Sequence, residues 1–485
     1  MSIHEQVALA RRTMTPTGLS IFGAAASAPM VVLAGGLVTT YATTRVTALP
    51  LTFLLVTAVV AVLMVGYTAL ARQVGHPAVY YGILAHGINR SWGVAAGLVA
   101  LVAYTAIQTS LYGLFGATLA GQLGGTWWVW AGIAWAVVGA LGVRAIALST
   151  WVLGGVLTVS LLIVGLFVAA GLGTPAGGTV SWEGFDASGL AVGGIGGAVA
   201  LCVAAFMGVD APGSFVEEAV DRRSVSRATI TAVLVLGGVY AAAAWAMGVA
   251  AGPHTIAARA ADPSSGLPFT ILEPAGHAWV GVAGVVLVFA IVTSMLAFHN
   301  VIARYVFAMA REGVLPTRLA RTDSTTRISA PRRGSLTQTA TAALVVAAFA
   351  VTGTDPVTVM FTWLSTLGAL GLLCLLLAAS IAALAAPPAV RGQRPGIWQW
   401  KVAPLLGMLG GSVVLVAMVG NVGSLLAAAP GSPYPLLLPA ILTATATTGG
   451  IWAAHLRRTR PDIYAGIGHG TPKTHAVPDA LHISI

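Results

Sequence analysis

Apolar segments of about twenty residues or more recur along this chain, and they restrict it to one class of fold. Only 8% of the 485 residues are charged and 57% are hydrophobic, whereas about 25% of the residues in an ordinary soluble domain are charged. A helix needs about 20 predominantly apolar residues to cross the hydrocarbon core of a bilayer. The sequence therefore predicts an all-α integral membrane protein without a separate catalytic domain of ordinary size.

Twelve apolar runs bounded by charged residues, Pro or Gly clusters predict twelve transmembrane helices. They span residues 18–41, 46–71, 92–119, 127–143, 145–171, 190–216, 228–252, 279–309, 336–351, 357–386, 402–429 and 434–455. We group them as two sets of five helices, 18–171 and 190–386, followed by a final pair in 402–455. Residues 1–17 form a polar N-terminal segment, and the polar composition of 456–485 predicts a disordered tail.

The basic residues fix the expected orientation. If the N-terminus is cytoplasmic, every one of the 24 Lys and Arg residues except Arg45 and Arg259 falls on the cytoplasmic side, as the positive-inside rule requires. Both termini are then cytoplasmic, and the net charge of +10 reflects topology, so no nucleic-acid partner is expected. Abundant Ala, Gly and Arg against two lysines are typical of a high-GC, actinobacterial-type chain. We therefore expect a bacterial plasma membrane protein.

Two of the predicted helices are interrupted by Pro beside small residues. The first contains Gly23-Ala-Ala-Ala-Ser-Ala-Pro29, and the sixth contains Phe206-Met-Gly-Val-Asp-Ala-Pro-Gly213. Proline removes a helical hydrogen bond, and freed backbone groups are tolerated at membrane depth only against protein or a cavity. Each segment is a broken helix or a simple proline kink. Breaks at the first helix of each five-helix set are typical of an inverted-repeat transporter with its site at the midplane.

Asp210 is the only one of the fourteen acidic residues inside a predicted span. A carboxylate at that depth costs about 2.5 to 3.5 kcal/mol on insertion scales and is a functional candidate by default. It would bind a cationic amine or carry a proton. The alternative is a structural cap on the second half of the broken helix.

Other polar residues at membrane depth are weaker candidates. Tyr104, Gln108 and Tyr112 recur every four residues and so share one helix face, which would line a cavity beside Asp210 or pack against another helix. His299 would relay a proton or serve only in packing. The tenth helix offers a gate at Thr362, Trp363 and Ser365.

The sixth helix and the loops that follow it resemble the amino acid, polyamine and organocation (APC) permeases. Phe206-Met-Gly-Val-Asp210 and Glu217-Glu218 resemble the F-x-G-F-(D/E) and E-E pattern of that family. Ala308-Met-Ala-Arg311-Glu-Gly-Val-Leu-Pro316 looks like its A-M-A-R-(D/E)-G-x-L-P motif, and Ala330-Pro-Arg-Arg-Gly334 resembles its entry to the ninth helix. The resemblance implies a five-plus-five inverted repeat, alternating access, and a substrate held by the broken helices, here at Gly23, Ser27, Ala28, Pro29, Gly208, Asp210 and Gly213.

The first helix departs from the family pattern. Many members carry G-(S/T)-G there, whose amides hold an amino acid carboxylate, whereas this chain has Ser27-Ala28-Pro29. Proline has no N–H to donate, which favours an amine or an atypical amino acid. Some proton-coupled relatives carry a lysine in the fifth helix, where this chain has only Arg144 at the helix end. A proton would then use Asp210, and the sodium alternative would use Thr293 or Ser294.

These features predict a secondary transporter that imports an amino acid or related amine with proton symport. We expect no cofactor and no resident metal; Cys202 and Cys374 lie inside apolar runs and indicate neither a disulfide framework nor a zinc site. An amine exchanger or exporter would show the same features, and a membrane sensor that lost turnover is a further alternative. An enzyme has no visible apparatus here, and nothing resembles a selectivity filter.

Overall fold

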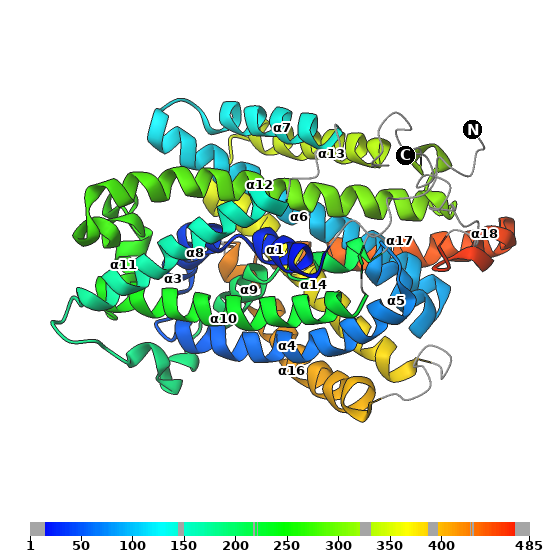
Figure 1. The fold of residues 1–485 in the computed structure, drawn as a ribbon, viewed down its shortest axis with the longest axis horizontal. Coiled ribbons are helices and arrows are strands. Elements are labelled where there is room, and N and C mark those ends of the chain that lie inside the picture. The colour runs from blue at the N-terminus through cyan, green and yellow to red at the C-terminus, as the bar shows by residue number, and fades with distance from the viewer. Residues whose placement is uncertain are drawn as a thin grey trace, which may run out of the picture.

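The helices of this computed structural model run mainly along the longest dimension of the molecule, as Figure 1 shows. The structure describes residues 15–143, 150–216, 219–220, 222–320, 331–386, 396–426, 428 and 431–470. Ten helices in this part of the chain are long and apolar enough to cross a membrane, and two shorter apolar helices, Trp127–Val143 and Ile195–Ala205, accompany them. The predicted all-α membrane fold is confirmed, while the count of twelve spans stays a prediction.

The elements follow one another without strands in the described residues. The first half of the chain forms α1 (Pro16–Ser27), α2 (Pro29–Val31), the π-helical η2 (Val32–Leu37), α3 (Val38–Thr44), α4 (Leu49–Val74), α5 (Val79–Gly87), α6 (Arg90–Leu123), α7 (Trp127–Val143), α8 (Thr150–Gly173) and α9 (Ile195–Ala205). The second half forms η5 (Ala211–Phe215), α10 (Arg222–Ala251), α11 (Ile256–Ala261), α12 (His277–Arg311), η8 (Thr317–Ala320), α13 (Arg332–Val351), η9 (Pro356–Phe361), α14 (Thr362–Ala385), η10 (Trp398–Val402), α16 (Ala403–Leu425), α17 (Tyr434–Thr459) and α18 (Pro461–Gly466). Short 3-10 turns connect several of these helices.

Capping residues set the ends of several long helices. Thr15 precedes α1 and accepts a hydrogen bond from the Gly18 N–H at 3.1 Å, and Asn89 does the same for α6 by accepting from Trp92 N–H at 3.1 Å. Gly75 ends α4 in the left-handed conformation with φ of 64°, which costs glycine no side-chain clash. These caps satisfy backbone groups that no residue of the helix itself can reach.

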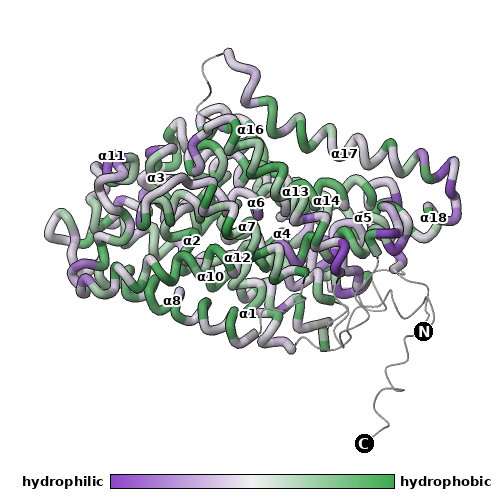
Figure 2. Tube along the Cα trace, turned by 90° about the horizontal axis from the view of Figure 1, so that it is seen from above, coloured by the Kyte–Doolittle hydropathy of each residue, from purple (hydrophilic) through white to green (hydrophobic). Residues whose placement is uncertain are grey.

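The bundle is hydrophilic at its two ends and hydrophobic between them. Figure 2 shows hydrophilic residues near α11 at one end and near α18 at the other. We call the α18 end the arginine-rich end, because α6 begins there at Arg90, α12 ends there at Arg311, and the last turn of α17 carries Arg457 and Arg458 there. Figure 1 shows α1 in the middle of the bundle and α7 beside α13 along one edge.

The C-terminal segment differs from the expected disorder over its first half. Helix α17 continues to Thr459, α18 follows, and the chain then lies against α5 and the end of α12 as far as residue 470. The guanidinium of Arg90 lies 5.7 Å from the centre of the Tyr464 ring. Composition missed this packing because the partners are distant in sequence. Residues 471–485 lie outside the described residues, as do Arg144, Glu217, Glu218 and the first residue of the Ala330–Gly334 motif.

Candidate functional site

The first interruption lies at Ala28. Helix α1 ends at Ser27, Ala28 has φ of 44° and ψ of 81°, and α2 begins at Pro29. A non-glycine residue in this left-handed region carries strain of about 1 to 3 kcal/mol and persists only where its surroundings impose it. Ala28 is buried, so the surrounding packing imposes a change of chain direction at the middle of this span.

The second interruption covers residues 206–210. Helix α9 ends at Ala205, the chain makes a series of turns, and the 3-10 helix η5 begins at Ala211. Gly208 has φ of 99°, and a Cβ atom built on it would lie 2.8 Å from Ala26 Cβ and 2.9 Å from the Ala26 carbonyl carbon. Only glycine satisfies both the backbone angle and this close approach.

The two interruptions lie against each other. Ser27 Oγ donates a hydrogen bond to the Met207 carbonyl oxygen at 3.1 Å, and a Cβ atom on Gly23 would lie 2.9 Å from Pro212 Cγ. Segments about 180 residues apart in sequence therefore meet at the centre of the bundle. Gly23, Ser27 and Gly208, three of the predicted site residues, belong to this contact.

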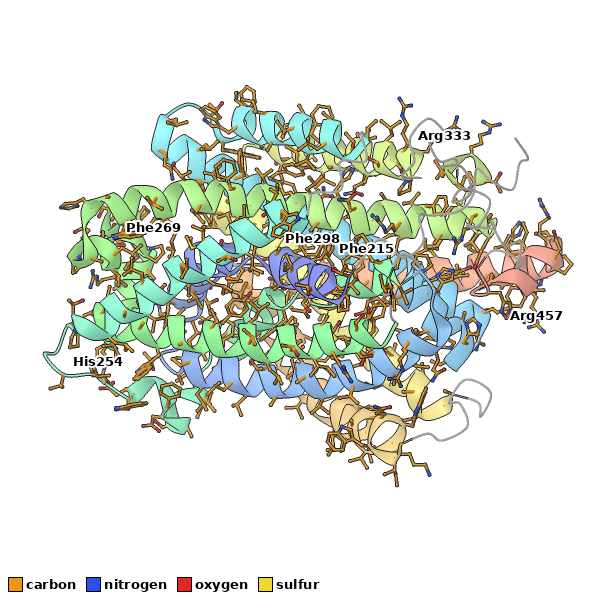
Figure 3. All side chains as sticks on the ribbon, viewed as in Figure 1. Phe215, His254, Phe269, Phe298, Arg333 and Arg457 are labelled. Atoms are coloured by element: carbon orange, nitrogen blue, oxygen red, sulfur yellow. The ribbon has the colours of Figure 1, made fainter. Side chains whose placement is uncertain are left out.

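A cavity of about 50 Å³ lies beside the two interruptions. Its described lining is uncharged: Ala26, Ser27, Val31, Val32, Gly36, Ile107, Leu111, Leu201, Ala204, Ala205, Met207, Ser294, Phe298, Phe361 and Ser365. Figure 3 shows Phe298 near the middle of the bundle. Because pockets for drug-sized ligands are about 300 to 1,000 Å³, a solute of several heavy atoms enters only when lining side chains move.

Residues from the C-terminal turns of two helices line this cavity. Ala26 and Ser27 belong to the last turn of α1, and Ala204 and Ala205 belong to the last turn of α9. Ser294 Oγ of α12 donates to the Ala26 carbonyl at 2.7 Å. The C-terminal end of a helix carries a partial negative charge of about half an elementary charge. The ends of α1 and α9 therefore favour a cationic group, and the start of α2, whose Val31 also lies in the lining, opposes it in part.

Asp210 lies among tyrosine side chains and does not line the cavity. Its side chain is 1% exposed, and its Oδ2 atom accepts hydrogen bonds from Tyr80 at 3.1 Å and from Tyr104. The Tyr67 hydroxyl donates to the Asp210 carbonyl at 2.9 Å. The Tyr305 hydroxyl accepts from the Tyr80 N–H at 3.1 Å, and its ring lies 5.5 Å from that of Tyr104. We call Asp210 with these four tyrosines the Asp210 cluster.

One oxygen of Asp210 lacks a partner. Among the described residues, Asp210 Oδ1 is one of four buried side-chain polar atoms without a hydrogen bond. A buried polar atom without a partner costs about 1 to 3 kcal/mol, and more when the group is charged. An oxygen atom left in this state is suited to accept a proton or a cation.

Gln108 and His299 belong to a separate polar group. Gln108 Nε2 lies 3.4 Å from His299 Nδ1, His299 Nε2 lies 2.7 Å from Ser335 Oγ, and Gln338 donates to Gln108 Oε1. All four side chains are buried, and they join α6, α12 and α13. The structure thus places His299 with Gln108 and Gln338, whereas Tyr104, one turn before Gln108, reaches Asp210.

The remaining predicted residues lie at varying distances from the cavity. Ala28 and Pro29 are buried at the first interruption, and Gly213 follows Asp210, where a Cβ atom would meet the Tyr67 hydroxyl. The Trp363 ring lies 6.1 Å from that of Tyr434 on α17. Thr293 Oγ1 donates to the Ala290 carbonyl at 3.0 Å, so of the two predicted sodium ligands only Ser294 reaches the cavity lining. Their roles in binding stay predictions.

Sequence reasoning missed three members of the Asp210 cluster. Tyr67 lies near the end of α4, Tyr80 lies on the short helix α5, and Tyr305 lies late in α12. Helix α5 falls in a segment expected to be a connection between two spans. The adjacent pair Tyr80-Tyr81 in this short connection was the available signal.

A second buried carboxylate lies at the arginine-rich end. Glu312 Oε1 is 3.0 Å from His76 Nε2 and accepts from the Gly470 N–H at 2.6 Å. Glu312 Oε2 accepts from the Gly468 N–H at 2.8 Å and from Tyr81. Burial alone raises the pKa of Glu312, but the hydrogen bonds from His76, Tyr81 and Gly468 outweigh it and hold the pKa below its usual value. We call this the Glu312 cluster.

Comparison with known proteins places the chain in one family. The model of a family described as "Amino acid permease" matches residues 17–445. No curated protein matches the chain in sequence.

Several solved structures share the fold. The manganese transporter of Eremococcus coleocola, in complex with an aromatic bis-isothiourea substituted compound, has a TM-score of 0.55 at 14% identity, over 94% of this chain and 100% of that one. A histidine-to-alanine mutant of the same transporter has a TM-score of 0.53 at 15% identity, over 92% and 95% of the two chains. At these identities the likeness establishes the fold alone.

Proposed function

Because this chain belongs to the amino acid permease family, we propose that it is a secondary transporter that imports an amino acid or a related amine by alternating access with proton symport. Family membership supports a membrane transporter rather than an enzyme. The substrate class, the coupling ion and the direction of transport are our proposal.

The observation that carries the proposal is the meeting of two helix C-terminal ends at one small cavity. The last turns of α1 and α9 both line it, at Ser27 and Ala205 among others. Each helix end stabilises a nearby cation by about 0.3 to 1 kcal/mol, and by more in a partly buried site. An ammonium group fits this environment, while the apolar lining suits a small hydrocarbon body.

The start of α2 supports an amine more than a carboxylate. Pro29 has no N–H, and the N–H groups of Val31 and Val32 both donate to the Ala28 carbonyl, at 2.8 and 3.2 Å. Few amides at this position are therefore left to hold a carboxylate. We propose that recognition of the ammonium group provides most of the affinity, and that a carboxylate on the substrate is tolerated and not required.

Proton coupling is assigned to the Asp210 cluster. Its free Oδ1 atom takes the proton, and the tyrosine hydroxyls on Oδ2 hold the side chain in place. Asp210 lies five residues beyond the end of α9, whose last turn lines the cavity. A change of charge on Asp210 therefore acts on the same interrupted segment that binds the substrate.

The arginine-rich end is proposed to face the cytoplasm of a bacterial cell, with both termini on that side. The concentration of Arg at the ends of α6, α12 and α17 supports this orientation under the positive-inside rule. An exchanger or exporter of amines would use the same cavity and the same carboxylate.

Matched pairs of ligands test the substrate class. We would measure the thermal stability of the purified protein with isobutylamine and valine, with ethylamine and alanine, and with Mn²⁺. A ligand that binds the folded state raises the apparent melting temperature. Each amine is expected to stabilise the protein at least as well as its amino acid. Stabilisation by the amino acids alone would contradict the amine preference, and stabilisation by Mn²⁺ alone would overturn the proposed substrate class.

A serine variant shows whether the ligand occupies this cavity. Ser294→Ala removes the hydroxyl that lies in the lining and bonds to the Ala26 carbonyl. We expect Ser294→Ala to weaken the free energy of ligand binding by about 1 kcal/mol, which corresponds to an approximately fivefold higher Kd. Ser380→Ala is the matched control, because Ser380 is also buried and donates to a carbonyl of its own helix, that of Leu376. If both substitutions raised the Kd equally, the ligand would not bind in this cavity.

A further inference from the structure

A second and much larger cavity lies on the opposite face of α6 from the central one. Its volume is about 410 Å³, and it lies between α6, α12, α13, α14 and η8. For comparison, an engineered apolar cavity of about 150 Å³ in another protein binds benzene. Thr341 and Val345 of α13 and Leu364 of α14 are half-buried members of its lining. The cavity therefore opens between α13 and α14 at the depth of the hydrocarbon core.

The polar side chains that line this cavity bond to the protein itself, so the surface that they present to the cavity is apolar. The hydroxyls of Thr109, Thr337 and Thr341 donate to carbonyls one turn earlier in their own helices, at 2.7, 2.8 and 3.0 Å. Gln338 accepts from Thr105 at 3.2 Å and donates to Gln108. The hydroxyl of each threonine therefore already has a hydrogen-bond partner, and its methyl group can contact an apolar ligand. Water needs two to four polar partners in a buried site, so an apolar occupant suits this cavity better.

Arginine residues lie at the end of this cavity toward the arginine-rich end. Leu315, which precedes η8, and Leu319 of η8 form that part of the lining, with the exposed Arg318 between them in sequence. Arg333 is one turn before the lining residue Thr337, and its Nη1 donates to the Arg318 carbonyl at 3.1 Å. Figure 3 shows Arg333 at the same end of the molecule as Arg457. Basic pockets between transmembrane helices on the cytoplasmic side are a recognised arrangement for anionic lipid headgroups.

We propose that this cavity binds one acyl chain of an anionic phospholipid whose phosphate lies at Arg318 and Arg333. The lipid comes from the leaflet at the arginine-rich end. Lipid tails are as apolar as the cavity, so burial of the chain alone gives little preference over the bilayer. The cavity determines where the lipid lies, and the two arginines determine which headgroup it carries.

The site is placed to influence transport. Its lining on α6 includes Ala106, which is adjacent to Ile107 of the central cavity, and its lining on α12 includes Ile302, one turn beyond Phe298. A bound chain fills the space between α13 and α14 and so supports α6 and α12, which line both this cavity and the central one. Occupancy of the lipid site and movement of the central site are therefore mechanically linked.

Titration of the purified, delipidated full-length protein with dioleoylphosphatidylglycerol or dioleoylphosphatidylcholine, followed by native mass spectrometry, tests the proposal. The first phosphatidylglycerol is expected to bind more tightly than the first phosphatidylcholine. Each arginine is expected to contribute about fivefold, so the double variant Arg318→Gln/Arg333→Gln should reduce phosphatidylglycerol affinity to near that of phosphatidylcholine. Arg457→Gln, at the end of α17, is the charge control. Equal affinity of the wild-type protein for the two lipids would overturn the headgroup assignment.

Filling the cavity tests where the acyl chain lies. Val345→Phe places a larger side chain in the lining, whereas Leu344→Phe places the same side chain on a residue that is 74% exposed and outside the lining. Val345→Phe should lower the affinity for both lipids at least fivefold, and Leu344→Phe should leave both affinities unchanged. If Val345→Phe does not fold, Leu364→Phe fills the same cavity from α14. Unchanged lipid affinity in a folded cavity-filling variant would overturn the proposal.

Discussion

Asp210 and Glu312 are both buried carboxylates, and they receive hydrogen bonds from adjacent residues of one short helix. Tyr80 of α5 donates to Asp210, and Tyr81 donates to Glu312. Glu312 also has the His76 ring and two backbone N–H groups, one on each oxygen. Asp210 has hydroxyl donors on Oδ2 and none on Oδ1.

We propose that this difference separates a structural carboxylate, Glu312, from a functional one, Asp210. A buried charge is stable when its lone pairs are satisfied and an opposite charge lies close, and Glu312 comes near to this condition. It fixes the residues after α18 against α5 and the end of α12. Asp210 lies at the centre of the bundle with no hydrogen bond to its Oδ1 atom, and an unsatisfied polar group is costly in such a place. We infer that evolution retained this cost because Asp210 exchanges a proton during transport.

The largest effect is expected where the chain turns toward Asp210. Gly208→Ala adds a Cβ atom at φ of 99° and within 2.9 Å of the Ala26 backbone. Backbone strain and overpacking together should lower the free energy of unfolding by about 2 to 4 kcal/mol. Transport should be lost, and thermal unfolding of the purified protein should show the destabilisation.

Gly420→Ala in α16 is the matched control. A Cβ atom on Gly420 meets nothing within 4 Å, and alanine is favoured over glycine inside a helix by about 0.5 to 1 kcal/mol. This variant should be as stable as the wild-type protein or slightly more so. Normal transport by Gly208→Ala would show that the close contact between the two interruptions is not required.

The adjacent tyrosines sharpen the comparison directly. Tyr80→Phe removes a donor from Asp210 and should reduce proton-driven accumulation about fivefold, the equivalent of about 1 kcal/mol. Amine affinity should stay unchanged, because Tyr80 does not line the cavity. Tyr81→Phe should leave accumulation intact and lower the melting temperature. Uptake into proteoliposomes and thermal unfolding would be measured on both variants. Loss of accumulation in Tyr81→Phe with normal accumulation in Tyr80→Phe would contradict the roles given to the two carboxylates.

A smaller, pH-dependent effect is expected at Glu312. Its pKa in the folded state lies below the ordinary value because the donors around it outweigh burial, so the unfolded chain binds more protons there and stability rises with pH. The contribution is fully present above the ordinary Glu pKa of about 4.3 and is lost as the pH falls through the folded pKa. Glu312→Gln should therefore melt below the wild type by about 2 °C at pH 7 and by less at pH 4.

The same pH series has an internal check. Burial lowers the pKa of His86, which lies beside His469 in this region, and its protonation also destabilises the folded protein as the pH falls. Because Glu312 also raises the pKa of His86, the effect of His86 does not cancel by itself, and both proteins are therefore compared in a His86→Gln background. A gap between the two proteins that widens on acidification would contradict the sign assigned to Glu312.

The sequence predicts the bundle far better than it predicts the site. Apolar runs report directly on membrane spans, and Pro with small residues marks both places where the chain turns, at Ala28 and at Gly208. Asp210 is identifiable because a carboxylate is rare at membrane depth. These signals are local, and each reflects a large free-energy term.

The partners of those residues could not be predicted in the same way. Tyr67 and Tyr80 bond to Asp210 and Tyr305 bonds to Tyr80, from three different helices. Apart from the adjacent pair Tyr80-Tyr81, nothing in their local sequence distinguishes them from packing tyrosines. Two alternatives were open for the face that carries Tyr104 and Gln108, and the two residues, one turn apart on α6, divide between them: Tyr104 contacts Asp210, and Gln108 packs against His299 of α12. Contacts between distant segments depend on how the helices pack, which local patterns do not determine.

The most direct test of the account compares accumulation with exchange in Asp210→Asn. Proteoliposomes would be assayed for proton-driven uptake of a labelled amine identified by the thermal screen, and for counterflow of the same amine without a gradient. The account predicts that asparagine, which keeps the shape of the side chain but cannot carry the proton, abolishes accumulation and preserves counterflow. Retention of full accumulation would contradict the account and reduce Asp210 to a structural cap of the interrupted helix.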